Sequence, residues 1–197
     1  MRLIIHRVNS LDFLQKIPKK YGVEIDVRSS KENLILNHEP FCDGDYLENY
    51  LKLCEGRFVV FNIKEAGIEW KVKDLAEKYN LDDYFLLDVE FPFIYNATRF
   101  NNFKKIAIRF SEAEPIELAL AQKKYLDWVW IDTNTLLPVN KSNVHLLSDF
   151  KTCLVCPERW NRPEDINIYK QLMKNLNFEP DAVMTNINYV KMWEDNH

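Results

Sequence analysis

Apolar runs of strand length alternate with helix-like patterns along the whole of this 197-residue chain. Eight of the runs combine β-branched and aromatic residues with flanking breaks, as buried strands do. Because strands that alternate with helices form parallel sheets, the pattern predicts a compact (β/α)8 TIM barrel with some reduced helices, in a single domain of residues 1–197. The predicted strands are Leu3–Arg7, Gly22–Arg28, Arg57–Lys64, Tyr84–Phe91, Lys105–Ser111, Trp128–Asn134, Lys151–Glu158 and Asp181–Asn188.

Helical periodicity fills the segments between these strands, and Ser10 has the character of an N-cap for the first helix. A doubly wound sheet is the main competing fold, but its G-x-G-x-x-G motif is absent and the chain has four glycines in all. The predicted helices are Ser10–Lys20, Asp45–Cys54, Ile68–Tyr79, Phe93–Asn101, Glu114–Tyr125, Ser142–Phe150 and Pro163–Asn175, with a partial helix at Tyr189–Asp195.

The composition excludes several classes of protein. Hydrophobic residues make up 47% and charged residues 28%, a balance typical of globular proteins. A net charge of -4 argues against a nucleic-acid partner, since phosphate contacts need a basic surface. The sequence has no run of the roughly 20 apolar residues that a membrane span needs, and its apolar start is too short for a secretory signal. We therefore predict a cytoplasmic protein without a membrane span; its oligomeric state is left open.

The cysteines include one C-x-x-C motif, Cys153 and Cys156, inside a predicted strand. Residues three apart on a strand point to opposite faces, which disfavours a shared zinc ion or a disulfide. A redox motif would open a helix, where the dipole lowers the thiol pKa. We predict that both cysteines belong to the core.

Charged residues occupy one face of the strand Gly22–Arg28. Glu24, Asp26 and Arg28 alternate with apolar residues, and period-2 geometry places them on the same side. Buried charges are costly unless something pairs with them. A divalent cation would satisfy the two carboxylates, because hard cations bind carboxylate oxygens. A buried salt bridge from Arg28 to either carboxylate is the alternative, and this stretch alone does not separate the two.

Polar residues recur where the predicted strands end, which in a (β/α)8 barrel is the edge that carries the active site. Two histidines, a carboxylate pair and nearby cations suit phosphoryl chemistry, in which the imidazoles transfer protons and the cations balance the charge of the phosphate. The strand-end residues are His6, Arg7, Glu24, Asp26, His38, Asn62, Lys64, Asp88, Glu90, Arg109, Ser111, Asp132, Glu158 and Asn186.

These motifs resemble those of the glycerophosphodiester phosphodiesterase family, a group of phosphatidylinositol-phospholipase-C-like phosphodiesterase TIM barrels. The resemblance rests on the order of the dipeptides and on their placement at successive strand ends, and it is densest between residues 3 and 64. The matching motifs are His6-Arg7, Glu24-Ile25-Asp26-Val27, His38-Glu39, Asn62-Ile63-Lys64 and the late segment DAVMTNINY.

The resemblance implies a metal-dependent phosphodiesterase acting on a small-molecule glycerophosphodiester. His6 and His38 would be the acid–base pair, and Glu24 and Asp26 would bind Mg2+ or Ca2+. Arg7 and Lys64 would hold the phosphate or steady the metal ligands. In the family, a neighbouring hydroxyl of the substrate often attacks phosphorus and gives a cyclic phosphate.

The chain departs from the family pattern at several positions. Val8 stands where the family commonly has glycine, and Glu39 replaces an aspartate. Asn62 replaces the third acidic metal ligand, so the predicted metal ligands are Glu24 and Asp26 with help from Asn62 or Glu90. Asn186 stands where the family often has aspartate.

Two alternative functions remain open from the sequence, together with one further candidate for substrate contact. Lys64 could pair with Glu24 or Asp26 in a network without metal, which would give a non-catalytic barrel that binds a phosphorylated ligand. Lys64 could instead form a Schiff base in an aldolase-like lyase. Trp160, beside Arg159 and Arg162, is a candidate for substrate contact.

Overall fold

The computed structural model describes residues 1–194, so Asp195 of the last predicted helix lies outside the described residues. The chain packs as two compact units. One unit is Ile4–Ala97, and the other joins Met1–Leu3 to the chain from Thr98 onward. Each has a mixed α/β fold in which parallel strands alternate with helices, in agreement with the coarse form of the predicted architecture. A closed (β/α)8 barrel and a single domain stay predictions.

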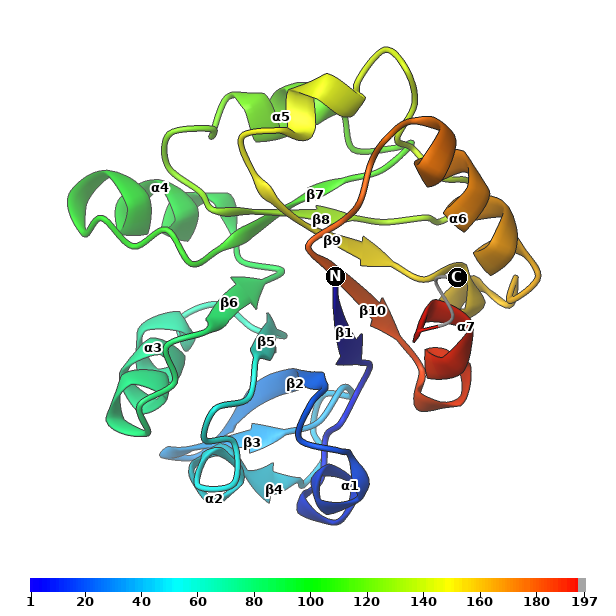
Figure 1. Ribbon diagram of the computed structural model, residues 1–197. Coiled ribbons are helices and arrows are strands. Elements are labelled where there is room, and N and C mark those ends of the chain that lie inside the picture. The colour runs from blue at the N-terminus through cyan, green and yellow to red at the C-terminus, as the bar shows by residue number, and fades with distance from the viewer. Residues whose placement is uncertain (195–197) are drawn as a thin grey trace. The chain divides into compact units, whose positions relative to one another are not determined.

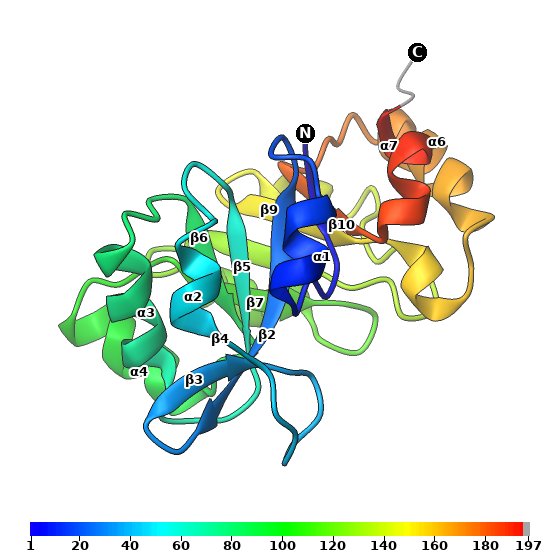
Figure 2. The ribbon, with the colours of Figure 1, turned by 90° about the horizontal axis from the view of Figure 1, so that it is seen from below.

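The sheet of Ile4–Ala97 is centred on a nine-residue strand, β2 (Figure 1). The first half of β2 pairs in parallel with β1 on one side and with β5 on the other, and β5 pairs in parallel with β6. The second half pairs antiparallel with β3, which in turn pairs with β4 (Figure 2). The elements are β1 (Arg2–Ile5), α1 (Leu11–Lys16), β2 (Gly22–Ser30), β3 (Asn33–Leu36), β4 (Asp45–Tyr46), α2 (Leu47–Leu51), β5 (Val59–Ile63), α3 (Glu69–Lys78), β6 (Tyr84–Leu87) and α4 (Phe91–Phe100).

The second unit contains four parallel strands in the order β7-β8-β9-β10 (Figure 1). Helices and short 3-10 turns connect them, as parallel strands require. The elements are β7 (Ala107–Phe110), α5 (Ile116–Leu120), β8 (Trp128–Ile131), η1 (Val144–Leu147), β9 (Lys151–Val155), η2 (Pro157–Trp160), α6 (Asp165–Asn175), β10 (Ala182–Thr185), η3 (Ile187–Tyr189) and α7 (Val190–Glu194).

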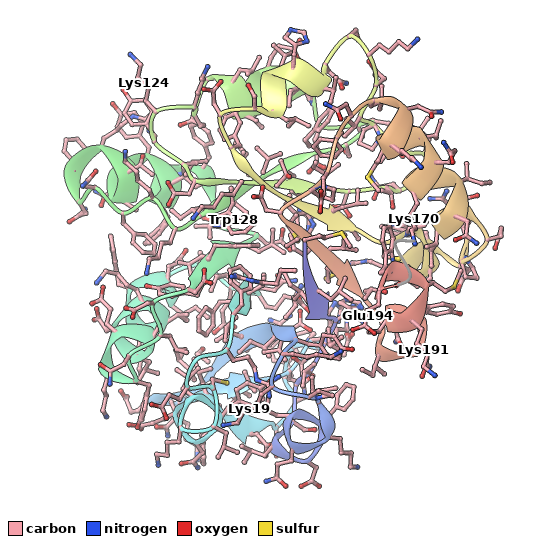
Figure 3. The ribbon with its side chains drawn as sticks, viewed as in Figure 1. Lys19, Lys124, Trp128, Lys170, Lys191 and Glu194 are labelled. Carbon is pink, nitrogen blue, oxygen red and sulfur yellow. The ribbon has the colours of Figure 1, made fainter. Side chains whose placement is uncertain are left out.

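The last two helices, α6 and α7, pack against each other within this unit. Lys170 of α6, which is labelled in Figure 3, donates a hydrogen bond to the backbone carbonyl of Met192 in α7. Trp193 is buried, and its indole nitrogen lies 3.0 Å from the sulfur of Cys156. Cys153 and Cys156 are both buried and neither forms a disulfide, which confirms that the C-x-x-C belongs to the core.

All eight predicted strands are present, but most end earlier than predicted. The segment Lys151–Glu158, for example, ends as a strand at Val155 because Pro157 opens a 3-10 turn. The predicted helix Asp45–Cys54 is wrong at its start, since Asp45 and Tyr46 pair with β3 as β4. Ser10 does cap the first helix, accepting a hydrogen bond from the backbone of Phe13 at 3.2 Å.

The predicted helix Ser142–Phe150 is reduced to the 3-10 turn η1. Glu114–Tyr125 is likewise shortened to the five residues of α5. Across residues 1–194, no helix has both the length and the apolar character that crossing a membrane would require.

Candidate active site

The site is built on the buried carboxylates of β2. Side chains of Glu24 and Asp26 are 1% and 0% exposed and lie on the same side of the strand, where they alternate with apolar residues. Parallel pairing with β5 sets Asp26 directly opposite Asn62. The regular sheet thus brings two carboxylates and one amide together, as the sequence predicted.

Glu24 receives a hydrogen bond on each of its oxygens. Oε2 accepts from the backbone N–H of Arg7 at 2.8 Å, and Oε1 accepts from the amide nitrogen of Asn62 at 3.0 Å. The ring nitrogen Nε2 of His6 lies 4.0 Å from Oε2. Burial, followed by repulsion from Asp26, raises the pKa of Glu24 to about 7.

Asp26 is held by one asparagine and faces two cations. Asn9 forms two hydrogen bonds with it: the Asn9 amide donates to Oδ2 at 2.7 Å, and the Asp26 N–H donates to Oδ1 of Asn9 at 2.8 Å. The ammonium of Lys64 lies 3.1 Å from Oδ1 of Asp26. The guanidinium Nε of Arg7 lies 3.9 Å from Oδ2. Of the two pairings considered for Lys64 from the sequence, with Glu24 or with Asp26, the structure shows the one with Asp26.

The turn after β1 contains Arg7, Val8 and Asn9, which contact Glu24 or Asp26. Arg7 adopts a left-handed backbone conformation, with φ of 54°, which is uncommon for a residue with a side chain. This turn directs the N–H of Arg7 to the Glu24 carboxylate and places Asn9 against Asp26. Val8 is fully buried, and its N–H donates to the backbone carbonyl of Glu24 at 2.9 Å.

His38 follows β3, and its ring is oriented by the next residue. Nδ1 of His38 lies 2.6 Å from Oε1 of Glu39, and the backbone N–H of Glu39 donates to Oδ1 of Asn37 at 2.9 Å. The hydrogen bond from His38 lowers the pKa of the Glu39 carboxyl. Because Nδ1 is engaged with a carboxylate, Nε2 is the nitrogen available for proton transfer.

Arg28 holds backbone groups rather than the buried carboxylates. Its Nε and Nη2 atoms donate to the carbonyl of His38 at 3.2 and 2.9 Å, and Nη1 donates to the carbonyl of Lys64 at 3.3 Å. Its ion-pair partner is Glu65, at 3.7 Å. The alternative prediction of a salt bridge from Arg28 to Glu24 or Asp26 is wrong, because the end of β2 turns this side chain toward the loop after β3.

Two further predicted site residues, Glu90 and Trp160, have surroundings of their own in the structure. Glu90 is exposed, and its backbone carbonyl accepts a hydrogen bond from the N–H of Ile94 in α4. The carboxylate that approaches Lys64 from this segment is that of Asp88, at 4.0 Å. Trp160 belongs to the other unit, where it is 41% exposed and lies under the guanidinium of Arg159 at 5.3 Å.

Polar residues also follow the strands of the second unit, as predicted. Arg109 of β7 forms an ion pair with the buried Asp132, and Oδ1 of Asp132 is buried without a hydrogen-bond partner. Glu158 accepts hydrogen bonds from the Thr185 hydroxyl at 2.6 Å and from the Asn186 N–H at 3.0 Å. Burial raises the pKa of Glu158.

The donor set around Glu24 and Asp26 does not fit a divalent cation. All four carboxylate oxygens already face a protein N–H donor or a cationic side chain. Oδ1 of Asp26 and the amide oxygen of Asn62 are both buried and have no hydrogen-bond partner, but the ammonium of Lys64, 3.1 Å from the former, already occupies the place beside Asp26. Among residues 1–194, no group of three or more His, Cys, Asp or Glu side chains is arranged to hold a metal.

The sequence did not single out Asn9. Its position two residues after Arg7 is the only signal, and that signal becomes informative once the left-handed turn is known. The role of Arg28 was also missed, because strand alternation places it beside Glu24 and Asp26 and says nothing of the hairpin that follows.

Comparison with known proteins gives matches in structure alone. No family model and no curated protein matches the sequence. A glycerophosphodiester phosphodiesterase from Agrobacterium tumefaciens is similar with a TM-score of 0.66 and 12% identity, over 94% of this chain and 97% of that one. An Oleispira antarctica phosphodiesterase, solved with the product sn-glycerol-3-phosphate, gives 0.64 and 15% identity, over 93% and 92%. The predicted resemblance is thus confirmed at the level of the fold.

Proposed function

We propose that this protein is a phosphodiesterase that cleaves a small-molecule glycerophosphodiester at the site around Glu24 and Asp26. One observation carries the proposal: His6, Arg7 and Lys64 converge on the two buried carboxylates, within a fold shared with two phosphodiesterases. Fold alone does not give function, so the side chains must supply the argument.

Arg7 and Lys64 are the proposed phosphate-binding residues. Arg7 is 43% exposed at its side chain, and its guanidinium is therefore open to a ligand while its backbone stays fixed to Glu24. Guanidinium groups bind phosphate oxygens through two parallel N–H bonds, and an ammonium adds a compact charge. Both cations would stabilise the negative charge that develops on the phosphoryl oxygens in the transition state.

His6 and His38 are the proposed acid–base pair. One imidazole takes the proton of the attacking hydroxyl, from water or from a neighbouring hydroxyl of the substrate, as the new P–O bond forms. The other donates a proton to the leaving alkoxide oxygen as the old P–O bond breaks. Contacts with Glu39 and Glu24 support the two roles, since a carboxylate stabilises the imidazolium that each ring becomes in turn.

A divalent cation was the other predicted component, Mg2+ or Ca2+ on Glu24 and Asp26 with Asn62 or Glu90. No step is assigned to this cation, because protein N–H groups and the ammonium of Lys64 already face the carboxylate oxygens. Trp160 remains a predicted substrate contact that awaits its own substitution test.

The test is release of sn-glycerol 3-phosphate from glycerophosphocholine and glycerophosphoethanolamine, with bis(p-nitrophenyl) phosphate as a generic diester. We expect turnover by the native protein and its loss in His6→Ala and in His38→Ala, with circular dichroism unchanged. His145→Ala, a histidine of the turn η1, is the matched control. Activity retained in both site variants would contradict the proposal.

A second function is favoured by the ion pair between Lys64 and Asp26, which neutralises one carboxylate without a metal. The same site could hold a phosphorylated ligand without turning it over. Calorimetry with sn-glycerol 3-phosphate separates the two, since binding by a protein that cleaves none of the three diesters would favour this function. The aldolase-like alternative is disfavoured, because an ammonium paired with a buried carboxylate is not the free amine that attacks a carbonyl.

A further inference from the structure

We infer that the ammonium of Lys64 takes the place of a divalent cation in this site, and that Asn62 is the residue that makes the site independent of metal. The inference rests on the proposed function for its location. Its tests read metal binding directly, so they do not depend on turnover.

The first support is the occupancy of the carboxylate oxygens. Glu24 accepts from the Arg7 backbone and from the Asn62 amide, and Asp26 faces Asn9 and Lys64, at distances between 2.7 and 3.1 Å. A cation at Oδ1 of Asp26 would compete with the ammonium of Lys64, which faces that oxygen at 3.1 Å. The Arg7 contact comes from the main chain of a fixed turn, which cannot swing away as a side chain does.

The second support is charge. With both carboxylates ionised, Glu24 and Asp26 carry two negative charges, and Lys64 and Arg7, at 3.1 and 3.9 Å from Asp26, carry two positive ones. Above about pH 7, where Glu24 is ionised, the group is therefore balanced by its own side chains. A divalent cation would leave a surplus of positive charge in a place where Lys64 is largely buried, and like charges in such a place repel strongly.

The third support is the chemistry of Asn62. Its amide nitrogen donates to Glu24 from the strand position opposite Asp26. A carboxylate at the same position would lack that donor and would place a third negative charge beside the other two. Three carboxylates in one buried cluster need a cation to coexist, whereas two carboxylates with an amide and an ammonium do not.

The position of Lys64 is itself fixed. Its backbone carbonyl accepts a hydrogen bond from Arg28, its N–H donates to the carbonyl of Val27 at 3.1 Å, and its ammonium also faces Asp88 at 4.0 Å. The main chain of Lys64 is therefore held on both sides, and its ammonium lies beside Asp26, where a bound cation would also lie.

The deciding experiment is isothermal titration with Mg2+ and with Ca2+ on the native protein and on Asn62→Asp and Asn62→Gln. We expect no saturable heat for the native protein or for Asn62→Gln, and a saturable one-site heat for Asn62→Asp. Thermal unfolding with and without each metal is the second readout, since a ligand that binds the folded state raises Tm.

Saturable binding of either metal to the native protein, lost in Glu24→Gln/Asp26→Asn, would overturn the inference. The native protein alone can decide this, so the result stands even where a variant fails to fold. Turnover that is unchanged by a chelator supports the inference, and turnover abolished by the chelator and restored by metal overturns it. Absence of turnover in both conditions counts against the proposed function, and the titration then decides the inference by itself.

Discussion

The Nζ atom of Lys64 lies 3.1 Å from Oδ1 of Asp26, a carboxylate with no exposed surface. Lys64 stands at the end of β5 and Asp26 lies in the middle of β2, so the pair joins two neighbouring strands of one sheet. Removing one partner of a buried ion pair is strongly destabilising, because the remaining charge is then buried without a partner.

We therefore expect Lys64→Met to destabilise the protein by about 3–5 kcal/mol, since it leaves the Asp26 carboxylate buried beside Glu24. Urea unfolding at neutral pH measures the change. Lys64→Met/Asp26→Asn is the companion variant, and it should recover part of the loss. Equal stability of Lys64→Met and the native protein would show that the pair contributes nothing.

Asn9→Ala should cost about 1–3 kcal/mol, because Asp26 loses the donor to Oδ2 and its own N–H loses an acceptor. The measurement is again urea unfolding. Asn175→Ala, at an exposed position of α6 where Gln171 donates to the side chain, is the control and should change stability little. Similar losses in both variants would mean that the Asn9 contacts with Asp26 are unimportant.

Glu24 makes the stability of the protein depend on pH. Its pKa is about 7 in the folded protein, against 4.5 for an ordinary glutamate, so between these values the folded chain holds a proton that the unfolded chain has released. The stabilisation that protonated Glu24 gives to the folded protein is fully present below pH 4.5 and is lost as the pH rises to 7. The free energy of unfolding should fall by at most about 1.4 kcal/mol per pH unit over this window.

Glu24→Gln removes this titration, and its unfolding free energy should therefore vary less between pH 4.5 and 7 than that of the native protein. Glu117→Gln, at an exposed position of α5, is the control and should keep the native slope. Parallel curves for the native protein and Glu24→Gln would refute the assignment.

Glu39→Gln tests whether the carboxylate beside His38 acts through the histidine. The substitution keeps the shape of the side chain but removes the charge that stabilises the imidazolium, so kcat should fall, by less than the roughly 10²–10⁴-fold expected for His38→Ala. The pH profile of kcat should shift while KM stays close to the native value. A changed KM with an unchanged pH profile would assign Glu39 to substrate binding instead.

The sequence was sufficient for the strands because their apolar content and their breaks are local properties. It was less informative about where strands end, since pairing decides that: Asp45 and Tyr46 read as the start of a helix but pair with β3. In the site, period-2 geometry was enough to place Glu24 and Asp26 on one face of β2.

Contacts that do not follow from strand geometry could not be predicted from the sequence. Asn9 meets Asp26 because Arg7 takes a left-handed turn, and no glycine marks that position. The hydrogen bond from Asn62 to Glu24 depends on which way an amide faces, and residue type alone leaves both directions open.

Arg28 donates hydrogen bonds to two backbone carbonyls, one on His38 and one on Lys64. One side chain therefore ties the loop that carries a proposed proton carrier to the strand end that carries a proposed phosphate ligand. Movement of either segment must be transmitted to the other or must break these bonds. If His38 moved to fit a substrate, its link through Arg28 would also move the backbone of Lys64. The distance between Lys64 and Asp26 would then change as well.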